Sequence, residues 1–167
     1  MHNLAVAAEK EAKRFLHGYV SGTESNLHEI IASFPGWTLQ EADGVWCAAF
    51  VYHCCHKNGM CFPIRPAECI TCNLAGCIAW EEWALADQRL LYFKEEDMCT
   101  PQPGDIVIFD RVFNGSEHDH MGIVLDVRDD MLITAEGNFN NVSALVERKR
   151  DEHIRCYIRI PENYIYG

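Results

Sequence analysis

The hydrophobic pattern of this sequence changes near residue 100, and this change is the strongest constraint on its fold. Residues 4–95 carry apolar side chains at a helical period, whereas residues 104–160 carry short runs rich in Val, Ile, Leu and Tyr. The turn signal Pro101-Gln102-Pro103-Gly104-Asp105 separates the two parts. This order predicts an α+β fold with N-terminal helices packed on a C-terminal antiparallel sheet of about five or six strands.

The individual elements follow from periodicity and from turn residues. Helices are expected at residues 4–17, 25–34, 44–57 and 78–89, and strands at 106–110, 121–128, 131–136, 144–149 and 154–160. Asp43 is the expected N-cap of the third helix, and Asp129-Asp130 the expected hairpin turn. The chain of 167 residues is too short for two full domains, so we expect one domain over residues 1–167.

Charge and apolar content exclude two classes of partner. The chain carries 25 acidic residues against 14 Lys and Arg, and this net charge of -11 disfavours nucleic acid. No apolar stretch approaches the roughly 20 residues of a membrane span, so we expect no membrane partner. The N-terminal apolar segment, residues 4–8, is followed at once by charges. We therefore expect no Sec signal peptide and synthesis in the cytoplasm. We also expect the protein to be a monomer.

The nine cysteines are expected to be reduced thiols, because nine is odd and no signal peptide is expected. The segment 53–77 is rich in Cys and His, and Cys69-Ile70-Thr71-Cys72 has the spacing of zinc ligands. No second pair of this kind accompanies it, so free thiols are favoured over a zinc site. Residues 39–44 offer too few spaced oxygens for calcium. We predict no metal and no cofactor.

Cys47 is the first candidate catalytic residue. In the first turn of the third helix it would lie among unpaired backbone N–H groups, which favour a thiolate. The alternative is that Cys47 is a small buried residue of the core. Its neighbour Trp46 is a candidate wall of a substrate groove, although tryptophan more often packs in a core.

His120 and Glu136 are the next candidates. Strand alternation directs Met121, Ile123, Leu125 and Val127 into the core and His120 to the opposite face, beside the open space left by Gly122. The hairpin at residues 129–130 makes His120 a near cross-strand neighbour of Glu136 and Asn138. A solvent-exposed acidic residue at a strand end is the alternative for Glu136.

These three residue types form a nucleophile, a base and an orienting group. In this arrangement the Cys47 sulfur attacks a carbonyl carbon, His120 relays the proton, and Glu136 holds the imidazole. The order along the chain is that of papain-like enzymes. The 73 residues from Cys47 to His120 are fewer than in papain, which indicates a more compact version.

Four blocks in this order resemble the CHAP family of cysteine, histidine-dependent amidohydrolases and peptidases: residues 46–51, 103–109, 120–124 and 136–138. The resemblance implies a papain-like fold and cleavage of amide bonds in bacterial peptidoglycan. It implies that Cys47 is the nucleophile, His120 the base, Glu136 the third member and Asn138 a supporting polar residue.

The resemblance leads us to expect an N-acetylmuramoyl-L-alanine amidase or a peptidoglycan endopeptidase. A protein made without a leader would act at the cell wall after release or export, as a phage or prophage endolysin or a lytic effector does. Two alternatives remain at this point. The same residues also suit another acyl-transfer enzyme, such as a deamidase or a transglutaminase-like enzyme, and the Cys-rich segment suits a non-catalytic, zinc-stapled binding module.

Overall fold

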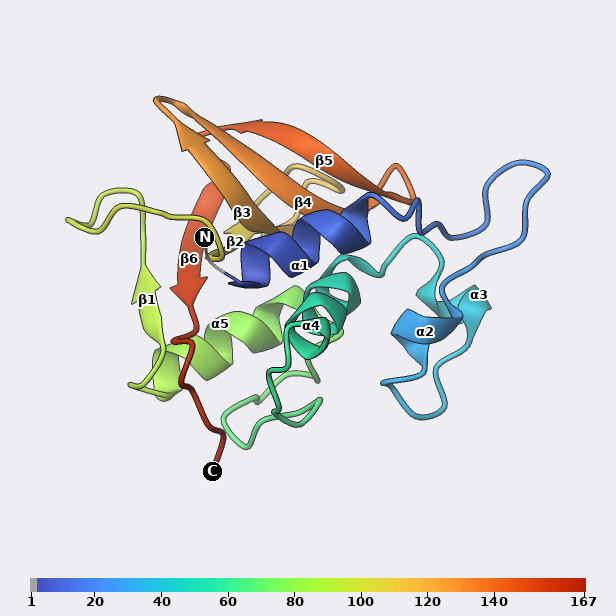
Figure 1. The fold of residues 1–167 in the computed structure, drawn as a ribbon, viewed down its shortest axis with the longest axis horizontal. Helices are drawn as coiled ribbons and strands as arrows, with labels where there is room; N and C mark the ends of the chain where they lie inside the picture. The colour runs from blue at the N-terminus through green and yellow to red at the C-terminus, as the bar shows by residue number, and fades with distance from the viewer. Residues whose placement is uncertain (1–2) are drawn as a thin grey trace.

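The computed structural model describes residues 3–167 and confirms the α+β prediction (Figure 1). The helices in this range are α1 (Asn3–Ala12), α2 (His28–Ile31), α3 (Leu39–Ala42), α4 (Cys47–Lys57) and α5 (Cys77–Ala86). The strands are β1 (Leu91–Phe93), β2 (Ile106–Phe109), β3 (His120–Arg128), β4 (Met131–Phe139), β5 (Val142–Lys149) and β6 (Ile154–Arg159). None of these helices is long and apolar enough to cross a membrane.

The strands form one sheet in the order β1-β6-β2-β3-β4-β5, and all neighbours are antiparallel. β6, the last strand in the sequence, therefore lies between β1 and β2. The expected hairpin at Asp129-Asp130 joins β3 to β4. A second two-residue turn, Asn140-Asn141, joins β4 to β5 with positive φ at both residues, a conformation that asparagine tolerates well.

Both faces of the sheet are covered by hydrophobic side chains. Ile106 and Ile108 of β2 belong to the main core with the helices, whereas Val107 and Phe109 belong to a second cluster on the other face. Val127 also packs in this second cluster, not with Met121 and Ile123 as predicted. A β-bulge between Val124 and Asp126 causes the difference, because one extra residue reverses the alternation beyond it.

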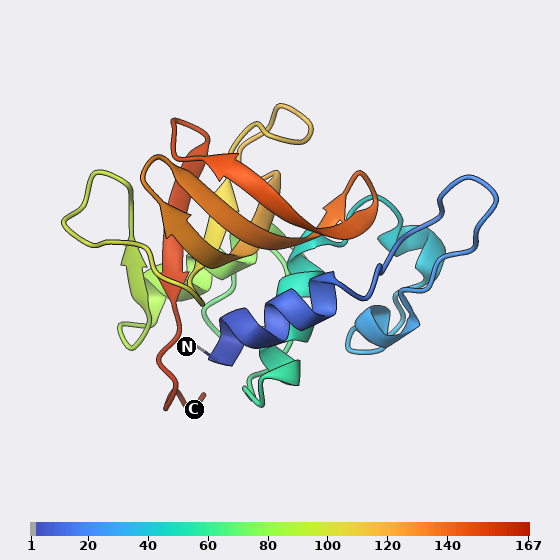
Figure 2. The ribbon, with the colours of Figure 1, turned by 45° about the horizontal axis from the view of Figure 1, so that its top comes forward.

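α4 is the central helix, and it packs with α1 against β3 and β4 (Figure 2). Its residues from Cys47 to Cys55 are all buried. A helix that is apolar on every side is stable only inside a core, and this one is enclosed by α1 and the sheet. Gly59 ends it at a φ of 83°, where its N–H and that of Met60 bond to the last carbonyls of the helix.

Other elements also differ from the prediction. The helix expected at residues 25–34 is reduced to the four residues of α2, and Ser25 and Asn26 hydrogen-bond to the backbone of His17 instead. α3 was not predicted, although Thr38 caps it by accepting from the Glu41 N–H at 3.1 Å. β1 was not predicted either, because three residues are too few for a periodic pattern and this strand forms by pairing with β6.

Candidate active site

Cys47 is the first residue of α4, as required for a nucleophile in the first turn. Asp43 is not the N-cap that we predicted; Trp46 holds that position, and Asp43 ends α3. The Asp43 carboxylate instead accepts hydrogen bonds from the Tyr19 N–H at 2.9 Å and the Asn141 side chain at 2.7 Å. The helix therefore starts three residues later than expected, since the short helix α3 occupies the chain up to Ala42.

The loop before Cys47 is held by side chains from the end of β4. The Asn141 Oδ1 accepts from the Gly44 N–H at 3.1 Å and from the Trp46 indole N–H at 2.9 Å. The Asn138 Nδ2 donates to the Gly44 carbonyl at 2.9 Å. These contacts fix the position of Cys47 relative to the strand that carries Glu136.

The Cys47 sulfur lies 3.7 Å from the sulfur of Cys77, the first residue of α5. The hydrogen bond with Cys77 lowers the pKa of Cys47 to about 5, because it stabilises the thiolate. Burial opposes this effect, while His120 and the Ala48 N–H add to it. The same contact, together with burial, raises the pKa of Cys77 well above its usual value.

The His120 ring is almost completely buried and is stacked against two aromatic side chains, Phe109 and Phe113. Its Nε2 lies 2.6 Å from Glu136 Oε2. Its Nδ1 has no hydrogen-bond partner among residues 3–167. Burial alone would lower the pKa of His120, but its interactions with Cys47 and Glu136 raise it to about 9.

Glu136 is fully buried, and its carboxylate is saturated with donors. Arg148 of β5 binds both oxygens, at 2.8 Å and 2.7 Å, and the Thr134 hydroxyl donates to Oε1 at 2.7 Å. Burial alone would raise the pKa of Glu136, but Arg148 and His120 lower it to about 2. The guanidinium of Arg148 also lies over the rings of Phe109 and Phe139.

Sequence reasoning missed four residues of this cluster: Thr134, Arg148, Asn141 and Cys77. Thr134 and Glu136 are two apart on β4 and therefore share a face, a signal that alternation alone would have given. Arg148 lies in a short basic run that looks like a solvated strand end. Nothing in the sequence indicates that Cys77, 30 residues after Cys47, contacts it.

Two predicted site residues have other surroundings. Trp46 is fully buried, packs on Phe50 and bonds to Asn141, so it has no exposed surface with which to form a groove wall. The expectation of a Trp46 groove wall is wrong, because the indole is needed to fill the core behind the nucleophile. Asn138 supports the loop before Cys47, as described above, and its contact is with Gly44.

The thiols of the cysteine-rich segment lie in different surroundings. Cys54 and Cys55 are buried within α4, and the Cys69 thiol donates to the Ala79 carbonyl at 3.4 Å. Across residues 3–167 there is no group of three or more His, Cys, Asp or Glu side chains that could hold a metal ion.

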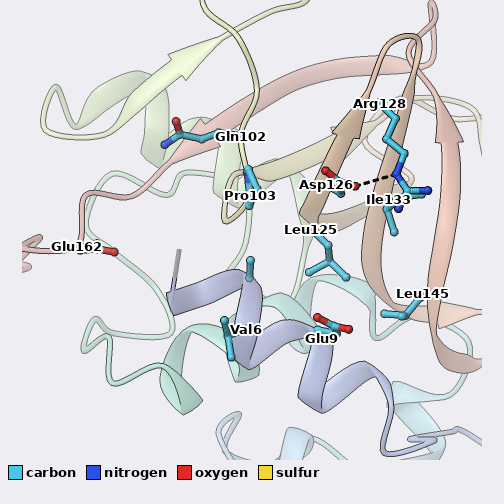
Figure 3. A pocket seen from close by; sticks show the side chains of 11 residues that line it. Val6, Glu9, Gln102, Pro103, Leu125, Asp126, Arg128, Ile133, Leu145 and Glu162 are labelled. Carbon is cyan, nitrogen blue, oxygen red and sulfur yellow. Dashed lines mark hydrogen bonds and ion pairs between the residues drawn. The ribbon is translucent and has the colours of Figure 1, made fainter. Parts of the chain in front are cut away.

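A large cavity lies elsewhere in the molecule. It has a volume of about 820 Å³, and it lies between α1, the turn at Gln102-Pro103 and strands β3 to β5 (Figure 3). Leu125, Ile133 and Leu145 line it, and the ion pair of Asp126 with Arg128 borders it. Cys47, His120 and Glu136 do not line this cavity, so it is separate from the cluster that these three residues form.

The cluster joins a thiol with a low pKa, an imidazole with a high pKa and a charged carboxylate. At neutral pH it therefore holds a thiolate and an imidazolium, which is the pair that nucleophilic attack on a carbonyl needs.

A model of the CHAP domain family matches residues 40–138, which is more than half of the chain and includes Cys47, His120 and Glu136. A search of curated proteins finds no matching relative. Domains of this family are generally amidohydrolases or peptidases of the peptidoglycan-hydrolase type. The chain belongs to the CHAP domain family.

Proposed function

We propose that this protein is a cysteine-dependent hydrolase that cleaves amide bonds in peptidoglycan with Cys47, His120 and Glu136. The observation that carries the proposal is the state of the His120 ring. Its Nε2 is held by the Glu136 carboxylate at 2.6 Å, and its Nδ1 makes no hydrogen bond within the described chain, while the Cys47 thiol is near enough to raise the pKa of the imidazole. This arrangement suits proton exchange between His120 and the reacting groups.

The first half of the reaction is acylation. The Cys47 thiolate attacks the amide carbonyl carbon, and negative charge develops on the carbonyl oxygen. The N–H groups at the start of α4 stabilise this oxyanion, because a helix leaves its first N–H groups without internal partners. His120 then gives its proton to the leaving amine as the C–N bond breaks, and a thioester on Cys47 remains.

The second half is deacylation. His120, now neutral, takes a proton from a water molecule that attacks the thioester carbonyl. The C–S bond breaks, the carboxylic acid product leaves, and the thiolate and imidazolium pair is restored. Throughout both halves Glu136 keeps the proton on Nε2 and the ring plane fixed, and Arg148 keeps Glu136 ionised.

Family membership supports peptidoglycan as the substrate. We propose that the protein cleaves either the amide bond between N-acetylmuramic acid and L-alanine or an amide bond within the stem or cross-bridge peptides. We propose Phe113, in place of Trp46, as the aromatic residue that contacts the substrate. Its ring is stacked on His120 and is 50% exposed, so it offers an apolar surface to a substrate peptide. An endolysin or a lytic effector, acting at the cell wall, is the biological setting that we propose.

Digestion of defined muropeptides with a mass-spectrometric readout tests the proposal. We expect cleaved products from the native protein and none from Cys47→Ala or His120→Ala. The matched control is Cys156→Ala, which removes a buried thiol outside the cluster. Full cleavage by a folded Cys47→Ala protein would contradict the mechanism. Uncut muropeptides that lose an amide nitrogen or gain an acceptor amine would instead identify a deamidase or a transferase.

A further inference from the structure

The contact between Cys47 and Cys77 is unlike that of any other thiol in the described residues. Their sulfur atoms lie 3.7 Å apart, and no other two cysteine sulfurs in residues 3–167 make such a contact. The two residues are the first of α4 and of α5, and their exposed fractions are 7% and 8%. The hydrolytic mechanism needs only one of these two sulfurs.

We propose that Cys47 and Cys77 form a reversible disulfide bond when the protein meets a peroxide, which switches the nucleophile off and protects it from irreversible oxidation. The inference rests on the proposed function for its consequence, since Cys47 is the nucleophile there. The formation of the bond itself does not require that peptidoglycan is the substrate.

The geometry favours this bond. A disulfide needs a sulfur–sulfur distance of about 2.05 Å, so each sulfur has to move by less than about 1 Å from its present position. The two sulfurs already face one another, because they are within hydrogen-bonding distance at 3.7 Å. The Ala48 N–H at the start of α4 helps to stabilise the Cys47 thiolate, which is the group that reacts with a peroxide.

The chemical steps balance with hydrogen peroxide as the oxidant. The Cys47 thiolate attacks one peroxide oxygen, which forms a sulfenic acid and releases hydroxide. The Cys77 sulfur then attacks the Cys47 sulfur. The S–S bond forms, the S–O bond breaks, and the hydroxyl group leaves as water with the Cys77 proton. A dithiol reverses the reaction by two exchanges, which return both thiols and leave the dithiol oxidised.

Cys72 is the alternative partner that the structure offers. Its sulfur lies against Gly76, since a Cβ at that glycine would meet it at 2.6 Å. Cys72 nevertheless makes no contact with another cysteine sulfur, and it is only partly buried. It therefore provides the matched control, because it is a thiol of the same segment that our proposal does not use.

The test is treatment of the full chain with a small excess of hydrogen peroxide, followed by alkylation and peptide mapping by mass spectrometry. We expect a peptide cross-linked through Cys47 and Cys77 in the native protein and in Cys72→Ser. In Cys77→Ser and Cys77→Ala we expect no cross-link and Cys47 as sulfinic or sulfonic acid. Dithiothreitol should restore free Cys47 in the native protein and not in the two Cys77 variants.

Two results would overturn the proposal: over-oxidised Cys47 without a cross-link in the native protein, or a cross-link to Cys72. Circular dichroism identifies any variant that fails to fold, and having two Cys77 substitutions keeps the comparison available. The mass readout is independent of hydrolysis. A cross-link in a protein that leaves muropeptides uncut would contradict the proposed function alone, and cleavage without a cross-link would contradict this inference alone.

Discussion

The side chain of Glu136 lies over the backbone of Gly122, and its Cγ would be 2.8 Å from a Cβ at that position. Gly122 is two residues after His120 on β3, and Glu136 lies on the neighbouring strand β4. The open space that the sequence predicted beside His120 is therefore filled by the carboxylate side chain that binds it. Because residue 122 has no side chain, the Glu136 side chain can extend over this position and reach the imidazole of His120.

Replacing Gly122 with alanine should separate Glu136 from His120. The added Cβ would also lie 3.0 Å from the backbone carbonyl oxygen of Ala135. This second contact is with the backbone of β4, which cannot move aside as easily as a side chain. We expect about 1–3 kcal/mol of lost stability from overpacking. We expect a fall of about 10²-fold in kcat/KM, because a shift of about 1 Å in a catalytic group has that effect.

Gly59→Ala is the control for this prediction. Gly59 has a φ of 83° and open space around it, so alanine there costs stability through backbone strain alone. Urea unfolding and kcat/KM per folded molecule separate the two effects. Equal activity losses in both variants would mean that contact with Glu136 is not the cause.

The hydrolytic rate should depend on pH as a bell. The thiolate of Cys47 forms as pH rises through its pKa of about 5, and the imidazolium of His120 is lost as pH rises through about 9. The active pair therefore exists between these values, and kcat/KM should fall outside them. Glu136→Gln should move the alkaline limb to lower pH, because the carboxylate helps to raise the pKa of His120. If this substitution leaves the alkaline limb unchanged, the Glu136 carboxylate does not raise the pKa of His120.

Removing the guanidinium of Arg148 should destabilise the fold. Arg148→Met leaves the carboxylate of Glu136 buried with His120 as its one charged partner, and loss of a partner from a buried pair costs about 3–5 kcal/mol. Arg148→Lys keeps the charge but not the two-pronged contact, so we expect a smaller loss. Arg150→Met, which breaks a more exposed pair with Glu95, should cost about 1 kcal/mol or less. Urea unfolding at pH 7 measures all three, and equal losses for Arg148→Met and Arg150→Met would contradict the prediction.

Asn138 has a φ of 59° and donates to Gly44, so its backbone and side chain can be tested apart. Asn138→Gly keeps the conformation and removes the hydrogen bond; Asn138→Ala also strains the backbone, by about 1–2 kcal/mol. We expect the same loss of activity in both variants and a larger loss of stability in the alanine variant. Asn140→Gly, in the adjoining turn, should leave activity unchanged. Native activity in Asn138→Gly would show that the Gly44 contact does not position Cys47.

The parts of the site that the sequence predicted are those set by local geometry. Cys47 was expected in the first turn of a helix capped by Asp43; the cap is Trp46 instead, and the helix begins at Cys47 itself. His120 and Glu136 had to be near neighbours, because a two-residue turn fixes the register of β3 against β4.

The parts that the sequence did not predict depend on packing between distant segments. The basic run around Arg148 is flanked by acidic residues, and the pairing of β5 with β4 is what puts its guanidinium on the face that carries Glu136. The sequence does not show whether Trp46 lines a groove or packs in the core. In the structure Gly137 leaves space for the indole of Trp46 beside Phe50. No pattern of spacing distinguishes Cys77 from the other thiols, because the meeting of two helix starts is a property of the tertiary fold.

The central place of β6 in the sheet has a consequence for biosynthesis. β1 and β2 are made early but cannot be joined until residues 154–159 are inserted between them. Pairing of such distant segments is slow, and it has to wait until the ribosome has released this stretch of chain. The six-stranded sheet, and with it the setting of His120 and Glu136, is therefore completed only after residues 154–159 have been synthesised.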